Sequence, residues 1–148
     1  MSTETEFVYR RVLRAPRELV WRCLTEPDHL TQFWAPAGMT TPRDGIVIEP
    51  WPGGRFETLM VGAHGSYRMV ATFTDVEPPQ RIGWVDSTTG VHTLSTLDDV
   101  GDGKTSIFIR QWNVPVSMQT EESRRGFLSS FDKLETYLSA LSGGDSRD

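Results

Sequence analysis

Residues 118–141 place the strongest constraint on how this chain folds. Their large apolar side chains are spaced by alternating steps of four and three, at Phe127, Phe131, Leu134, Leu138 and Leu141. This spacing puts them on one stripe of an α-helix. Charged residues occupy the other face, and Ser142, Gly143 and Gly144 form a stop signal after the last apolar residue. The pattern predicts a long amphipathic helix whose apolar stripe must cover another element.

The residues before this helix predict a sheet and two short helices. Runs rich in strand-forming residues occur at 7–13, 46–49, 56–60, 66–76, 81–86, 91–97 and 105–113. Between the first two runs, Pro16 and Pro27 each mark the start of a short helix, because proline is tolerated in the first helical turn. We therefore expect an α+β fold, a curved sheet gripped by the C-terminal helix, in a single domain of residues 1–142 with a polar tail at 143–148.

Composition excludes several classes of function. The chain has 148 residues and a formal net charge of -5, which argues against a nucleic-acid-binding or anionic-membrane surface. No apolar run approaches the length of a membrane span, and the N-terminal residues lack a signal-peptide pattern. The single cysteine, Cys23, rules out an internal disulfide and fits a reducing compartment. These observations predict a cytoplasmic protein without membrane insertion, in which Cys23 is a small core residue rather than a nucleophile.

Several short segments, in a fixed order along nearly the whole chain, carry a family resemblance. They are residues 15–21, 26–30, 33–36, 52–56, 76–82 and 103–105, and in the last helix Gly126, Phe127, Leu134, Tyr137 and Leu138. In these segments the chain resembles the bacterial family named for the activator of the ninety-kilodalton heat-shock protein ATPase. That family lies within the superfamily of START and birch-pollen-allergen-like proteins, SRPBCC. The chain departs from the usual family pattern at Phe127, where tryptophan is common, and at the polar end of its last strand, residues 110–113.

This resemblance implies a helix-grip fold, with a seven-stranded antiparallel sheet wrapped around the C-terminal helix. In many relatives a cavity between sheet and helix takes a small apolar ligand. The fold does not imply a single activity, so function must be argued from the site. Three hypotheses follow: a binder of a small apolar molecule, a chaperone ATPase-stimulating interaction module, and a polyketide cyclase-like enzyme with Glu57 or His92 as general base. A homodimer through exposed strands or loops would be compatible with each of them.

No motif in the sequence demands catalysis or a cofactor. His29, His64 and His92 lie far apart without the spacing of a metal site. The chain has no Gly-x-Ser-x-Gly elbow for a nucleophilic serine. We therefore expect neither a metal nor an organic cofactor.

Residue sizes predict that the grip is hollow. The first half of the last helix carries small residues, at Ser123, Gly126, Ser129 and Ser130, which would leave room beside the sheet. Aromatic and methionine side chains suit the walls of a pocket that takes an apolar ligand. The residues expected to line the cavity are Phe33, Trp34, Met60, Tyr67, Met69, Trp84, Trp112, Met118, Gly126, Phe127 and Ser130. If they form walls rather than a filled core, Trp84→Ala should weaken binding without unfolding the protein.

Charged residues within the strand patterns supply the polar candidates. Glu57, Arg68 and Arg110 sit among apolar neighbours, and burying a charge is costly unless it is paired. Two interpretations remain open: Glu57 or Arg110 orients a polar group of the ligand, such as a carboxylate on the arginine, or these charges lie on the solvated face. Residues 107 and 109 share one face of the last strand, and residues 108, 110 and 112 share the other. The alternation alone does not say which face is inward.

Overall fold

The computed structural model describes residues 6–146 of the chain. Its elements are β1 (Phe7–Leu13), α1 (Arg17–Thr25), α2 (Pro27–Leu30), β2 (Met39–Thr40), the 3₁₀ helix η1 (Arg43–Gly45), β3 (Ile46–Ile48), β4 (Arg55–Gly62), β5 (Gly65–Glu77), β6 (Arg81–Asp86), β7 (His92–Gly101), β8 (Lys104–Trp112), the 3₁₀ helix η2 (Val116–Met118) and α3 (Glu121–Ser146). Every strand expected from the sequence is present. The two-residue β2 is additional.

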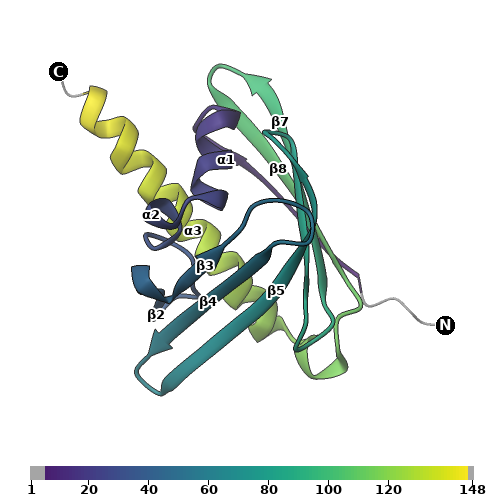
Figure 1. The fold of residues 1–148 in the computed structure, drawn as a ribbon. Helices are drawn as coiled ribbons and strands as arrows, with labels where there is room; N and C mark the ends of the chain where they lie inside the picture. The colour runs from purple at the N-terminus through teal and green to yellow at the C-terminus, as the bar shows by residue number, and fades with distance from the viewer. Residues whose placement is uncertain (1–5, 147–148) are drawn as a thin grey trace.

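The strands form one antiparallel sheet in the order β1-β8-β7-β6-β5-β4-β2, and β3 also pairs with β4. Figure 1 shows that the sheet curls into a half-barrel. From β4 to β8 each strand pairs with the next along the chain, and β1 then pairs with β8. The turn between β7 and β8 contains Asp102 and Gly103, both at positive φ, as suits the Asp- and Gly-rich turn of a hairpin.

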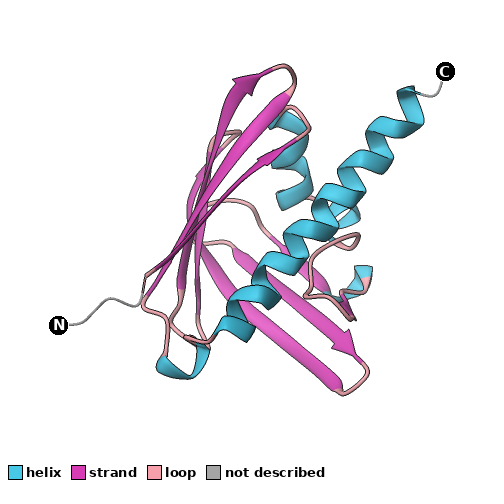
Figure 2. Ribbon diagram, turned by 180° about the vertical axis from the view of Figure 1, so that it is seen from behind, coloured by secondary structure: helices cyan, strands magenta, loops and turns pink. Residues whose placement is uncertain are grey.

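Helix α3 crosses the concave side of the sheet (Figure 2). Phe131, Leu134 and Leu138 are buried in the core, which confirms the helix-grip fold and the apolar stripe. The helix begins at Glu121 because the hydroxyl of Thr120 accepts the backbone N–H of Ser123 at 3.0 Å, as an N-cap does.

Both ends of the helix differ from the expectation. Met118 lies in η2, before the helix, and α3 continues to Ser146 rather than ending at Gly143. Glycine costs about 1 kcal/mol relative to alanine inside a helix, and this cost does not forbid helical backbone. Leu141, the last member of the stripe, is 38% exposed. Figure 1 shows the reason, because the C-terminal end of α3 projects beyond the sheet and has nothing there to cover.

Burial settles which face of each strand is inward. In β8, Ile107 and Ile109 are buried, so Arg110 and Trp112 lie on the outer face. In β4, Phe56 and Thr58 are buried, so the intervening Glu57 also faces outward. Both strands thus follow the alternation of an antiparallel sheet with one face on a core.

The short helices fill one part of the grip. Helix α1 packs against β7 and β8 and buries Val20, Cys23 and Leu24, and α2 buries Leu30. Burial raises the pKa of the Cys23 thiol to about 11, which keeps it protonated and unreactive near neutral pH. Cys23 is therefore a core residue, as the sequence indicates.

Candidate functional site

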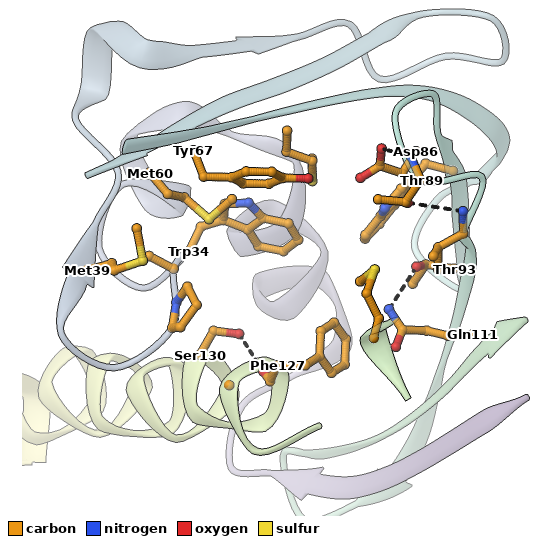
Figure 3. Close-up of a pocket in the computed structure, with 17 residues that line it drawn as sticks. Trp34, Met39, Met60, Tyr67, Asp86, Thr89, Thr93, Gln111, Phe127 and Ser130 are labelled. Atoms are coloured by element: carbon orange, nitrogen blue, oxygen red, sulfur yellow. Dashed lines mark hydrogen bonds between the residues drawn. The ribbon is translucent and has the colours of Figure 1, made fainter. Parts of the chain in front are cut away.

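A cavity of about 400 Å³ lies between the sheet and the first turns of α3. Its walls come from the segment after α2, from β4 to β8 with their turns, from η2 and from α3 (Figure 3). The lining residues are Trp34, Ala35, Pro36, Met39, Met60, Tyr67, Met69, Trp84, Asp86, Thr89, Val91, Thr93, Gln111, Met118, Gly126, Phe127 and Ser130. Most of these side chains are apolar, as in small-molecule sites generally.

An aromatic cluster forms the rigid side of the cavity. The rings of Trp34 and Trp84 meet edge to face with centroids 5.8 Å apart, and Phe56 lies within 5.2 Å of both. The indole N–H of Trp34 donates to the hydroxyl of Thr58 at 3.2 Å. The only polar group of the Trp34 side chain is therefore already hydrogen-bonded within the protein, and Trp34 presents an apolar surface to the cavity.

The cavity is hollow because α3 carries small residues where it passes. A Cβ added at Gly126 would meet only the Cβ of Pro36, at 3.9 Å. The neighbouring Ser130 turns its hydroxyl back to donate to the carbonyl of Phe127 at 2.9 Å. Larger residues follow one turn later, at Phe131 and Leu134, where helix and sheet are in close contact. The predicted change from small to large residues along α3 therefore corresponds to the change from cavity to packed core.

Polar groups gather at one end of the cavity. The Oδ1 atom of Asp86 accepts the backbone N–H groups of Thr88 and Thr89 at 2.8 and 3.1 Å. Gln111 donates from its side-chain amide to the hydroxyl of Thr93 at 3.2 Å. In Figure 3 the ring of Tyr67 extends across the cavity with its hydroxyl toward Asp86. Burial, and secondarily the charge of Asp86, raises the pKa of the Tyr67 phenol, so this group is neutral at physiological pH.

A segment held by α3 forms the opposite side of the cavity. The ammonium of Lys133 donates to the carbonyls of Ala35, Pro36 and Met39 at 2.9, 3.4 and 3.0 Å. The backbone N–H of Ala37 donates to the hydroxyl of Ser129 at 2.9 Å. These bonds hold Pro36 and Met39, which line the cavity, against the helix.

Comparison with known proteins identifies the family. The model described as Activator of Hsp90 ATPase homolog 1-like protein matches residues 14–139. The chain belongs to this family. The match confirms the resemblance seen in the sequence, within the SRPBCC superfamily. A comparison with curated proteins gave no match.

Solved structures share the fold of this family member. A protein from Nitrosomonas europaea is 22% identical, with a TM-score of 0.83 over 97% of this chain and 99% of that chain. A protein from Chromobacterium violaceum is 23% identical, with a TM-score of 0.81 over 89% of this chain and 96% of that chain. An AHSA1-like protein from Aeromonas hydrophila is 21% identical, with a TM-score of 0.81 over 93% of this chain and 94% of that chain. At these identities the likeness shows the fold alone.

In this member of the Hsp90 ATPase activator-like family, the cavity brings together most of the residues expected to line it. Those that line it are Trp34, Met60, Tyr67, Met69, Trp84, Met118, Gly126, Phe127 and Ser130. They come from the segment after α2 and from β4, β5, β6, η2 and α3, and the curl of the sheet under α3 makes them neighbours.

Four expected site residues lie elsewhere, and each has a partner that explains its position. Phe33 is only 1% exposed and packs in the core at a centroid distance of 6.2 Å from Trp34. On the outer face, Glu57 accepts from Arg55 at 3.0 Å. Arg110 and Trp112 also lie on the outer face of the sheet.

Arg110 and Trp112 are adjacent on the outer face of β8. Arg110 donates to Glu6 at 2.7 Å, and its guanidinium lies 5.1 Å from the ring centroid of Trp112. The Trp112 ring stacks on His92 at 5.0 Å. The hypothesis that Arg110 or Glu57 orients a ligand in this cavity is therefore wrong. Glu57 and His92, the candidate bases of a cyclase-like enzyme, are both outside the cavity.

The sequence reasoning missed the polar end and the far wall of the cavity. The missed lining residues are Ala35, Pro36, Met39, Asp86, Thr89, Val91, Thr93 and Gln111. Strand alternation held a usable signal for Asp86, which shares a face of β6 with the expected wall residue Trp84. Gln111 shares a face of β8 with Ile107 and Ile109, and only burial shows that this face is inward. Residues in turns, such as Thr89, had no such signal.

The described part of the chain contains no group of three or more His, Cys, Asp or Glu side chains placed to hold a metal ion. Within the same residues, no helix has the length and apolar character needed to cross a bilayer.

Proposed function

We propose that this protein binds a small, mostly apolar molecule in the cavity between the sheet and α3. The observation that carries the proposal is the cavity itself, about 400 Å³ in volume and walled mainly by aromatic and methionine side chains. This volume falls in the range of small-molecule sites, roughly 300–1,000 Å³.

The methionines support the proposal. Four of the five methionines in the chain, Met39, Met60, Met69 and Met118, line this one cavity. Methionine is unbranched and polarizable, so its side chain adapts to the shape of what it contacts. A rigid aromatic side and an adaptable methionine side together suit a flat apolar ligand.

The other two hypotheses draw less support. The family description names an activator of a chaperone ATPase, but the feature that carries the proposal is a cavity rather than a protein-binding surface. A cyclase-like reaction would need a different base from Glu57 or His92, since both face away from the cavity. The proposal also includes a cytoplasmic location, because the single cysteine, Cys23, is a buried free thiol.

A thermal-shift screen tests the proposal. The compounds are fatty acids, sterols, flavonoids, aromatic amines and aromatic acids. A ligand at a hundredfold excess over its Kd stabilises the folded state by about 2.7 kcal/mol. For a domain of this size that corresponds to a rise in Tm of roughly 5–10 °C.

Variants of Gly126 make the screen specific for the cavity. Gly126→Leu should fill the space beside Pro36 and abolish the shift, whereas Gly126→Ala adds only one methyl group and should retain it. Both remove the same helix glycine, so helix propensity is nearly matched. A hit that shifts Gly126→Leu as much as the parent binds elsewhere, and its binding would contradict the proposal.

Trp84→Ala is a poor probe of the site, contrary to the expectation from sequence. Trp84 packs against Phe56 and Phe73 at centroid distances of 5.0 and 6.3 Å, so it belongs to the core as well as to the cavity wall. Truncating a buried tryptophan costs about 3–5 kcal/mol of stability.

A further inference from the structure

The charge of the cavity indicates what kind of polar group its ligand carries. Among the described residues that line it, Asp86 is the only one that is charged at neutral pH. Tyr67 is a neutral phenol there, and the remaining polar side chains are hydroxyls and one amide. The cavity therefore has a net negative charge at one end and an apolar interior elsewhere.

The Asp86 carboxylate is positioned to receive a hydrogen-bond donor. Its Oδ1 atom is held by the backbone N–H groups of Thr88 and Thr89, which fixes the side chain. Its other oxygen makes no hydrogen bond to any residue that the structure describes. Because the hydrogen bonds to Oδ1 fix the whole carboxylate, its second oxygen is already oriented to accept a hydrogen bond from the ligand.

The groups around Asp86 add to this preference. The side-chain carbonyl of Gln111 is a further acceptor, and one of its two amide N–H groups donates to Thr93. Figure 3 places Asp86, Thr89, Thr93 and Gln111 at one end of the cavity and Met39 and Met60 at the other, with the Tyr67 ring extending from the methionine end toward Asp86.

An anionic ligand group is disfavoured for the same reasons. It would face the Asp86 carboxylate in a mostly apolar cavity, where like charges repel more strongly than in water. The ammonium of Lys133 on α3 does not line the cavity and is engaged by the backbone carbonyls of Ala35, Pro36 and Met39. The arginine expected to anchor a carboxylate, Arg110, is on the outer face of the sheet.

We propose that the ligand is an apolar, flat molecule that carries a protonated amine, with the ammonium group hydrogen-bonded to Asp86 and the body between Trp34, Trp84 and the methionines. This inference rests on the proposed function and names the class of molecule that the site takes.

Calorimetric titration of three matched compounds tests it. They share a naphthalene body and differ in the polar group: 2-naphthylmethylamine, 2-naphthylmethanol and 2-naphthoate. We expect the amine to bind at least about tenfold more tightly than the alcohol, because its ammonium adds charge attraction to the hydrogen bond with the Asp86 carboxylate, which a neutral hydroxyl lacks. The carboxylate should bind more weakly than the alcohol. An alcohol that binds as tightly as the amine, or a carboxylate that binds best, would overturn the inference and leave the proposed function standing. Failure of all three compounds to bind would count against both.

The variant Asp86→Asn identifies the group responsible. Asparagine keeps an oxygen that can accept from Thr88 and Thr89, so the turn is retained while the charge is lost. We expect the preference for amine over alcohol to fall below about twofold, because the amine loses its charged partner. Asp98→Asn is the matched control, because Asp98 is exposed on β7 and its loss changes the net charge equally. Equal effects of the two variants would show that overall charge, and not Asp86, sets the preference.

Discussion

At the residue scale, alternation along a strand decides whether a polar side chain serves the cavity or the surface. Arg110 and Gln111 are neighbours in β8, yet Gln111 lines the cavity and Arg110 pairs with Glu6 outside it. From the sequence, Arg110 was the expected anchor because it is charged, whereas Gln111 is neutral. Only side chains on the inner face of the sheet reach the cavity, so a ligand contacts the amide of Gln111 and not the guanidinium of Arg110.

Paired substitutions at these neighbours test that assignment. Arg110→Met should change the Kd of a screening hit by less than about twofold, as expected for a surface substitution. Gln111→Met should change it more, because it removes a polar group from the cavity while keeping similar volume. Isothermal titration of both variants with the same ligand provides the measurement, and the reverse ranking would contradict the placement of the two side chains.

The buried Cys23 thiol predicts a pH dependence of stability. Burial raises its pKa from 9.0 to about 11 in the folded protein. The folded state therefore holds this proton more tightly than the unfolded state does. Its contribution is complete below about pH 9 and is lost as the pH rises toward 11, a decrease of about 3 kcal/mol in the free energy of unfolding.

Urea unfolding of the parent protein and Cys23→Ala, at several pH values from 8 to 11, isolates this contribution. The raised pKa of the Tyr9 phenol affects both proteins alike, whereas the pKa of the Tyr137 phenol is raised by burial and then by the charge of Cys23, so it also responds to this substitution. We expect the parent to be the more stable at pH 8 and to lose that advantage by pH 11. Curves that stay parallel over this range would show that Cys23 does not titrate differently in the two states.

At the element scale, α3 has two functions along its length. Its first turns carry Gly126 and Ser130 past the cavity, and its middle carries Phe131 and Leu134 into the core. Its polar face is not simply solvated. Arg11 of β1 pairs with Asp132 and Glu135 at 2.9 and 3.4 Å, and Lys133 binds the segment after α2.

Gly126→Ala should stabilise the protein by about 0.5–1 kcal/mol. Alanine favours the helix over glycine by this amount, and the added Cβ makes only an ordinary contact with Pro36. Thermal unfolding without ligand measures the effect. A loss of stability would mean that the cavity wall is tighter at this point than the 3.9 Å separation indicates.

Lys133→Met should loosen the wall segment of residues 35–39. It keeps the aliphatic length and removes three hydrogen bonds from a charged donor, which predicts a loss of about 1–3 kcal/mol. Hydrogen exchange should accelerate at the amides of Ala37 and Met39. Lys104→Met is the matched control, since Lys104 is the only other lysine of the chain and is exposed at the start of β8. Similar exchange in both variants would contradict this role for Lys133.

At the scale of the whole molecule, the packing of α3 against the sheet forms the hydrophobic core and also supports the walls of the cavity. Leu134 is fully buried at this contact, whereas Leu141 is 38% exposed on the projecting end of the same helix. Leu134→Ala should cost about 2–5 kcal/mol of stability, and Leu141→Ala about 1 kcal/mol or less. Equilibrium unfolding of both variants measures the contrast, and equal losses would place the end of α3 in the cooperative core.

The sequence by itself determined the elements, the fold and the family of this protein. Periodicity and turn residues are local properties, so the strands and the apolar stripe of α3 could be read directly, and small residues at Gly126 and Ser130 indicated where the grip is hollow. Only the tertiary structure decided which faces of β4 and β8 look inward, since alternation has two equivalent phases until burial selects one. That selection moved Glu57, Arg110 and Trp112 to the outside and brought Asp86 and Gln111 to the cavity. The charge of the cavity was therefore a tertiary property, because it depends on which side chains the curl of the sheet turns toward α3.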